Sequence, residues 1–163
     1  MVIAPTLQAY LEQKQIGYDL VGHKPTRSSK STAEACHVAG DCVAKGVVLR
    51  LPEGYVLAIL PASHRIRLTD LEAQFGEDCD FASELELASL FPDCALGAVP
   101  PVGECYGLDL VVEDSIRGRA EIYFEGGDHT TLVHMRQAQF AQLIGDAPHA
   151  HFAVATGTAE RHG

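Results

Sequence analysis

Lys45 is the residue of this chain whose type and position most directly suggest chemistry. It lies near the start of an apolar run over residues 43–51. If that run is a β-strand, its side chains alternate between two faces, and Lys45 shares a face with Val43, Val47 and Leu49. The ammonium group then either reaches water, which is the more common case, or is held in a cleft. In a cleft it can bind a phosphate or stabilise a developing negative charge, and a lowered pKa would let it act as a base or nucleophile.

Residues 97–103 form a second candidate, a predicted loop that begins and ends with glycine and has two prolines inside it. The plain interpretation is a rigid connection between a helix and a strand. The functional interpretation is a wall of backbone, because glycine permits a ligand to approach closely and neighbouring N–H groups can bind an oxyanion. In that case the peptide groups at Ala98 and Val99 would contact the substrate.

His129 follows the sequence Gly126-Gly127-Asp128 at a predicted hairpin tip. A histidine there is usually just exposed, but it can also orient a substrate or a water molecule. It is poorly spaced from His134 for a shared metal, and no set of Cys and His residues has the spacing of a recognised metal site. We therefore expect neither a metal nor a cofactor. The five cysteines include no C-x-x-C pair, and reduced, buried thiols are their expected state.

A polar, proline-interrupted stretch over residues 23–30 is the best place on the chain for phosphate contacts, although such a stretch is more often a solvated surface. It contains three of the 12 Lys and Arg residues, in a chain with 22 acidic residues and a formal net charge of −10. That charge disfavours a broad non-specific grip on nucleic acid, which needs many cations, but leaves room for a local basic patch. The three basic residues are Lys24, Arg27 and Lys30.

The elements that must position these residues are short helices and strands. We expect a hairpin of strands over residues 43–51 and 55–60, whose second strand is apolar throughout and covered on both faces. Capping-box patterns that begin at Ser31, Thr69 and Ser83 predict three helices. Further expected elements are a first helix from Thr6, strands near residues 18–21, 108–112, 120–124 and 131–135, a short extended piece at His64, and a last helix that carries Phe140, Leu143 and Ile144.

These patterns indicate one α+β domain with a mixed β-sheet flanked by short helices. The length of 163 residues and the apolar content of 47% suit a single core, so we assign the domain to residues 1–146 and a flexible tail to residues 147–163. Residues 1–20 contain no basic segment followed by an apolar one, and no apolar run approaches the length of a membrane span. We therefore expect a cytoplasmic location and no membrane partner.

Three stretches, in this order and spacing, resemble the YbaK/ProX family of aminoacyl-tRNA deacylases. They cover residues 43–50, 57–65 and 90–103, and the turn at residues 126–129 fits the late G-x-H region of the family. The resemblance extends over about residues 20–145. It implies the fold of the editing domain that is associated with prolyl-tRNA synthetase, either free-standing or appended to the enzyme.

The resemblance implies hydrolysis of the ester that joins a wrong amino acid to the 3′-terminal adenosine of tRNA. Lys45 then corresponds to the essential lysine of the family, Gly97 and Pro101 to its G-x-x-x-P loop, and His129 to a residue seen in several subfamilies. The implied partners are the 3′ end of a mischarged tRNA and prolyl-tRNA synthetase. The residues expected to bind the substrate are Lys24, Arg27, Lys30, His64, Ala98 and Val99.

The chemistry of the substrate agrees with this set of residues. An aminoacyl ester is already activated, so its hydrolysis needs a positioned water and stabilisation of the tetrahedral oxyanion rather than a strong nucleophile. Two departures from the family pattern, Gly46 where many members have Thr or Ser and Val102 where many have Phe, leave open whether Ala, Cys, Ser or Thr is removed. Two other hypotheses remain: a catalytically idle module that binds tRNA or a synthetase, and a small-molecule hydrolase or regulator with the same fold.

Overall fold

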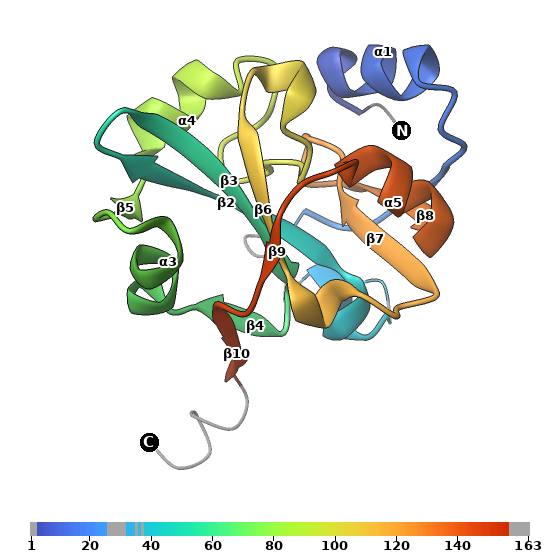
Figure 1. Ribbon diagram of the computed structural model, residues 1–163. Coiled ribbons are helices and arrows are strands. Elements are labelled where there is room, and N and C mark those ends of the chain that lie inside the picture. The colour runs from blue at the N-terminus through green and yellow to red at the C-terminus, as the bar shows by residue number, and fades with distance from the viewer. Residues whose placement is uncertain (1–2, 26–31, 35, 37, 157–163) are drawn as a thin grey trace.

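The centre of the fold is an antiparallel hairpin of two eight-residue strands, β2 (Ala44–Leu51) and β3 (Gly54–Pro61). Figure 1 shows the computed structural model, which describes residues 3–25, 32–34, 36 and 38–156. β3 also pairs in parallel with β6 (Asp109–Glu113), and β6 pairs in parallel with β9 (His149–Ala150). With β5 (Asp80–Phe81) on the other edge, the sheet order is β5-β2-β3-β6-β9. Parallel and antiparallel pairs occur together, so the predicted mixed sheet is confirmed.

A second, antiparallel sheet has the order β1-β8-β7 and is formed by β1 (Asp19–Gly22), β8 (Thr131–Arg136) and β7 (Glu121–Glu125). A single parallel bridge between Val43 and Tyr123 joins the edge of this sheet to β2. The remaining described elements are the helices α1 (Pro5–Gln13), α3 (Leu68–Phe75), α4 (Glu84–Leu90) and α5 (Gln137–Ile144), the 3-10 turns η1 (Gly40–Cys42), η2 (Glu104–Tyr106) and η3 (Asp114–Ile116), and the strands β4 (His64–Ile66) and β10 (Ala153–Ala155).

Two large apolar clusters lie on the two faces of the hairpin, and a third, small cluster surrounds Val43 at its end. The first cluster lies between the two sheets and includes Val48, Leu57 and Phe124, with α1 and α5 packed against it. The second cluster lies on the opposite face of β3, where Leu60 packs with Leu71 of α3 and with Phe152. β3 is therefore buried on both faces, as its unbroken apolar sequence predicts.

Two of the predicted helix starts can be compared with the structure. Ser83 caps α4 as predicted, because its Oγ accepts a hydrogen bond from the backbone N–H of Glu86 while the Glu86 carboxylate accepts one from the Ser83 N–H. The prediction at Thr69 is wrong, since α3 begins at Leu68 and Arg67 provides no side-chain cap. The pattern that begins at Ser31 falls partly outside the described residues.

The structure differs from the expected tail between residues 147 and 156. β9 extends the large sheet, and β10 pairs antiparallel with β4. Between these two strands the Phe152 side chain is fully buried, and its N–H donates a 2.6 Å hydrogen bond to the buried carboxylate of Glu113. The sequence of this segment has no periodicity, since isolated side chains such as Phe152, rather than a repeating apolar face, hold it against the core. Within the described part of the chain, no helix is long and apolar enough to cross a membrane.

Candidate functional site

Lys45 is the second residue of β2 and pairs with Leu60 of β3. Its side chain is only partly exposed, and burial lowers the pKa of its ammonium group. Among the described residues it has neither a hydrogen-bond partner nor an ion-pair partner. A cation that loses water without gaining a counter-charge is costly, which makes Lys45 a candidate for a functional role.

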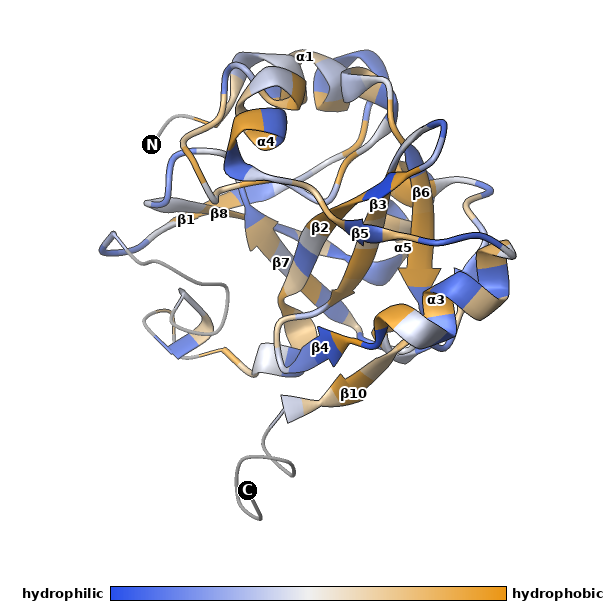
Figure 2. Cartoon of the chain, turned by 90° about the vertical axis from the view of Figure 1, so that its left-hand side faces the viewer, coloured by the Kyte–Doolittle hydropathy of each residue, from blue (hydrophilic) through white to orange (hydrophobic). Residues whose placement is uncertain are grey.

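The bridge between Val43 and Tyr123 defines which side chains of β7 share a face with Lys45. Counting two residues further along each parallel strand leads to Lys45 on β2 and to Glu125 on β7, so both point to the same side of the seam between the sheets. Figure 2 shows β2 and β7 next to each other at this seam. The structure has no ion pair between Lys45 and Glu125 within its described residues.

The G-x-x-x-P loop is attached to both strands of this seam. At its start, the N–H of Ala95 donates a 2.7 Å hydrogen bond to the carbonyl of Gly127, in the turn that follows β7. At its end, a Cβ placed on Gly46 would lie 3.3 Å from the Cα of Pro101 and 3.0 Å from Leu57. The departure at Gly46 thus has a structural reason in this chain, because a larger residue would press on the loop. Pro101 is buried and anchors the loop on β2.

His129 packs against the first residue of that loop. Its Nε2 atom makes a short hydrogen bond with the carbonyl oxygen of Leu96, and a Cβ on Gly97 would lie 3.5 Å from the imidazole. His129 has a φ of +62° and Gly97 a φ of +83°, which is the left-handed region that non-glycine residues rarely occupy. Backbone strain of this kind concentrates at functional sites, which adds to the case for His129.

The Asp128 carboxylate holds the His129 turn in this conformation. Its two oxygens accept hydrogen bonds from the N–H of Thr130 (2.9 Å), the N–H of Thr131 (2.8 Å) and the hydroxyl of Thr131 (2.9 Å). These bonds lower the pKa of Asp128 against the opposing effect of its burial. The turn therefore has an anchor of its own, independent of the rest of the site.

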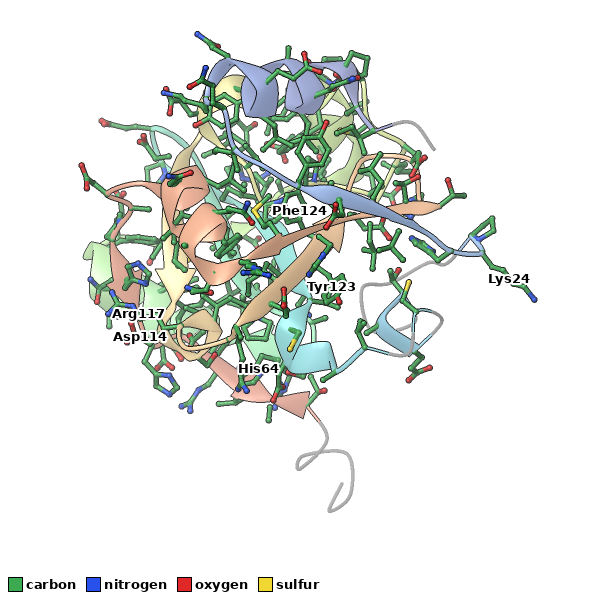
Figure 3. The ribbon with its side chains drawn as sticks, turned by 90° about the vertical axis from the view of Figure 1, so that its right-hand side faces the viewer. Lys24, His64, Asp114, Arg117, Tyr123 and Phe124 are labelled. Carbon is green, nitrogen blue, oxygen red and sulfur yellow. The ribbon has the colours of Figure 1, made fainter. Side chains whose placement is uncertain are left out.

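Two further residues predicted to bind the substrate, His64 and Lys24, lie within the described part of the chain. The imidazole of His64 is bonded to the hydroxyl of Ser63 at 2.9 Å, and Figure 3 shows it on a different side of the molecule from Lys24. In the described part of the chain, no hydrogen bond or ion pair links His64 with Lys45 or His129. Lys24 is exposed just after β1, whereas Arg27 and Lys30 lie outside the described residues.

The predicted role of the Ala98 and Val99 peptide groups is only partly compatible with the loop. The N–H of Ala98 already donates a 3.0 Å hydrogen bond to the carbonyl of Ala95, and the Ala98 side chain is fully buried. Val99 lies in the wall of a small apolar cavity of about 260 Å³ between the loop and α4, together with Gly97 and Leu96. An oxyanion would thus not find a free N–H at Ala98 unless the loop changed its hydrogen bonds.

Other features of the structure do not converge on these residues. A groove of about 910 Å³ lies at the far end of β2 and is lined by residues such as Leu51, Tyr55 and Asp109, with none of the predicted site residues. No cluster of three or more His, Cys, Asp or Glu side chains within the described ranges is arranged to hold a metal ion.

Sequence reasoning missed Glu125. The Glu125 side chain is buried, and burial raises the pKa of its carboxyl group, although a hydrogen bond from Thr32 and the charge of His23 oppose that effect. Side chains alternate between the two faces of β7, so the sequence indicated that the Glu125 side chain would share a face with Glu121 and Tyr123. Nothing local in the sequence indicated that this face would be covered.

Comparison with known proteins finds one matching family model and several solved structures with a similar fold. A family model described as an aminoacyl-tRNA editing domain matches residues 23–143. A crystal structure of "a putative trans-editing enzyme for prolyl tRNA synthetase" is similar with a TM-score of 0.81 and 25% sequence identity, over 93% of this chain and 97% of that chain.

Two further solved structures share the fold. A structure from a study of computational epitope grafting onto scaffold proteins has a TM-score of 0.80 and 24% identity, over 93% of this chain and 97% of the other. A structure described as "a Putative signal transduction protein" from Marinobacter aquaeolei VT8 has a TM-score of 0.77 and 18% identity, and the match covers 93% of this chain but only 31% of that larger chain. No curated protein matches the chain in a sequence search.

Proposed function

The chain belongs to the aminoacyl-tRNA editing domain family, and on this premise we propose that it hydrolyses the ester bond of mischarged tRNA in trans. The observation that carries the proposal is Lys45, a partly buried cation that no described carboxylate pairs with, on the strand that anchors the G-x-x-x-P loop. The similarity to a protein described as a trans-editing enzyme for prolyl tRNA synthetase supports the same activity.

The proposed reaction is the addition of water to the ester carbonyl of the aminoacyl group. The ester C–O bond then breaks, and the proton that the water loses is balanced by protonation of the ribose oxygen that leaves with the tRNA. The ammonium group of Lys45 stabilises either the tetrahedral oxyanion or the phosphate at the 3′ end. Both roles need a cation that no protein carboxylate has neutralised.

His129 is proposed to orient the water or the substrate. A hydrogen bond from Nε2 to a carbonyl oxygen requires the proton on Nε2, so Nδ1 of a neutral imidazole is left as an acceptor. That acceptor can take a hydrogen bond from a water or from a ribose hydroxyl.

A cysteine nucleophile is a poorer explanation of the site. Burial raises the pKa of Cys94 to about 11 and that of Cys105 to about 12, which leaves little thiolate at neutral pH. The proposed mechanism therefore uses water as the nucleophile, as an activated ester permits.

The proposed substrate is tRNA(Pro), or a related tRNA, that carries a small amino acid such as Ala, Cys, Ser or Thr. Prolyl-tRNA synthetase is the proposed partner, and the cytoplasm is the proposed location. A binding module of the same fold, which holds tRNA or the synthetase without hydrolysis, is the second candidate, because Ala98 leaves the backbone wall with fewer free donors than the sequence suggested.

Deacylation assays with a panel of mischarged tRNAs test the proposal, with wild-type protein compared with Lys45→Ala and with Arg50→Ala as a control on the same strand. We expect at least one mischarged tRNA to be cleared by the wild type and by the Arg50 variant, and not by Lys45→Ala. If no mischarged tRNA is cleared faster than it hydrolyses spontaneously, the enzyme proposal fails. Filter binding as a function of salt then examines the binding module, for which phosphate contacts predict a steep slope.

A further inference from the structure

Glu125 lies at the junction of three chain segments. The Nε2 atom of His23, at the end of β1, is 3.3 Å from Oε1 of Glu125, and the His23 side chain is fully buried. The hydroxyl of Thr32 donates a 3.0 Å hydrogen bond to the same oxygen. One carboxylate oxygen on β7 thus contacts two residues that are nine positions apart in the chain.

The His23 imidazole also contacts the backbone of Lys24. Its Nδ1 atom is 2.7 Å from the carbonyl oxygen of Lys24, so Nδ1 carries a proton and donates it to that carbonyl. The backbone N–H of His23 donates a second 2.7 Å hydrogen bond, to the carbonyl of Thr130 beside the His129 turn. Figure 3 shows that the Lys24 side chain itself extends away from the protein into solvent.

The contact between His23 and Glu125 is a close approach of two charged or polar side chains rather than a hydrogen bond, because Nε2 of His23 has no hydrogen-bond partner among the described residues. Burial raises the pKa of Glu125, while the hydrogen bond from Thr32 and the charges of His23 and His129 oppose that effect. Asp128 and Cys36 are the other titratable groups near this carboxyl. The second oxygen, Oε2, has no hydrogen-bond partner among the described residues.

We propose that Glu125 is a positioning residue for tRNA binding, which holds His23 and Thr32 on β7 and thereby places Lys24 beside the His129 turn. The inference rests on the proposed function, because it assigns Lys24 to the binding of tRNA phosphate. Glu125 acts through His23 and does not contact the substrate.

The expected effect of losing Glu125 is on binding rather than on hydrolysis. The His129 turn is held separately by Asp128, and Lys45 is held by β2, so the residues proposed for the reaction keep their supports. A contact from Lys24 to phosphate is made equally in the ground state and in the transition state. Its loss therefore raises KM and leaves kcat nearly unchanged.

The test measures kcat, KM and the dissociation constant for tRNA in wild-type protein and in Glu125→Ala. We expect KM and the dissociation constant to rise about tenfold, with kcat within about twofold of wild type. Glu125→Gln, which keeps the shape and an acceptor for Thr32, should recover a large part of the loss. Glu121→Ala is the matched control, because it removes a glutamate on the same face of the same strand that contacts His134 instead.

A double variant tests whether the effect passes through Lys24. If it does, Lys24→Ala combined with Glu125→Ala should bind tRNA no more weakly than the weaker of the two single variants. Additive losses would overturn the proposal. A fall in kcat at constant KM, or an equal loss in the Glu121 control, would overturn it as well.

Two outcomes separate this proposal from the proposed function. If wild-type protein binds tRNA but clears no mischarged tRNA, the deacylase proposal fails and the dissociation constants still decide the role of Glu125. If wild-type protein does not bind tRNA, both proposals fail. Should Glu125→Ala not fold, as judged by its circular dichroism, Thr32→Val removes the hydroxyl that donates to Glu125 at nearly constant shape and is expected to raise the dissociation constant by a smaller factor in the same direction.

Discussion

Two cationic side chains on β2, Lys45 and Arg50, lie five positions apart and differ in their exposure to water and in their counter-charges. Arg50 has a side chain that is 49% exposed, and its guanidinium group lies 2.9 Å from Glu86 and 3.9 Å from Asp80. Lys45 is more enclosed by its surroundings, and no carboxylate within the described ranges pairs with it. The better solvated Arg50 has two counter-charges, whereas Lys45, which has lost water, has none in the described part of the chain.

This difference separates a structural cation from a candidate functional one. Hydrogen bonds from the Ser83 backbone and from Tyr55, together with the charge of Arg50, lower the pKa of Glu86 to about 2, so this carboxylate stays charged and joins β2 to α4. Lys45 has no such partner among the described residues. An unpaired cation is available to an anionic ligand, which is what a phosphate or an oxyanion requires.

The replacement Lys45→Met should produce the largest effect. We expect a loss of at least about 100-fold in kcat/KM for deacylation, the usual cost of removing one group that stabilises an oxyanion. The free energy of unfolding should not decrease, because the variant removes a desolvated cation that has no partner. Steady-state deacylation and urea denaturation measure the two quantities. A stable variant with full activity would show that the contrast with Arg50 has no functional meaning.

The replacement Gly97→Ala should produce an intermediate effect. An Ala at φ +83° costs about 1–2 kcal/mol of backbone strain, and its relief would shift the loop relative to His129. We expect deacylation to fall about tenfold, since small displacements of positioned groups are costly. Gly107→Ala is the control, with a φ of +72° and no atom near its Cβ position, and it should lose similar stability without losing activity. Equal activities of the two variants would remove the loop from the site.

The pH dependence of stability should show a smaller difference between wild type and Lys45→Met. The pKa of Lys45 is lower in the folded state than in the unfolded state, so between the two values the unfolded chain binds more protons. Wild-type stability should therefore rise relative to the Met variant as the pH increases from the folded pKa towards the unfolded value of about 10.4. Urea denaturation of both proteins across this alkaline range is the measurement, and parallel pH profiles would mean that Lys45 is not desolvated.

The replacement Arg50→Ala should have the smallest effect on activity. We expect deacylation to stay within about twofold of wild type and the free energy of unfolding to decrease slightly, as is usual for exposed ion pairs. High salt should reduce that decrease, because it screens the pair in the wild type. A large loss of activity would mean that Arg50 belongs to the site and that its ion pairs do not distinguish it from Lys45 as a structural cation.

The sequence predicted the fold well where the signal was local and repeated. The hairpin of β2 and β3, the capping box at Ser83 and the late strands follow from alternation, turn residues and caps, all of which act over a few positions. It failed at Thr69, where the pattern exists but the helix starts two residues earlier, with Arg67 in the cap position. It also missed β9 and β10, because Phe152 and Glu113 are 39 positions apart and only the folded chain brings them together.

The site was predictable from the sequence only in part, because some of its contacts join segments that are distant in the chain. Lys45, Gly97, Pro101 and His129 could be named as candidates from their residue types and from the resemblance to a family. The attachment of the loop to β2 through Gly46, and the packing of His129 on Gly97, depend on contacts between distant segments. The hydrogen bond between His64 and Ser63 is a further contact that the residue types alone did not indicate, and the role of His64 in binding the substrate stays a prediction.

The sequence by itself determined that Lys45 would lie on a strand with a mostly apolar face, because the alternation of side chains is a local property of the backbone. Whether that lysine would be paired was decided only by the tertiary structure. Pairing depends on which carboxylates the other segments of the chain place nearby. The fold places Glu86 beside Arg50 and Glu125 beside His23 instead.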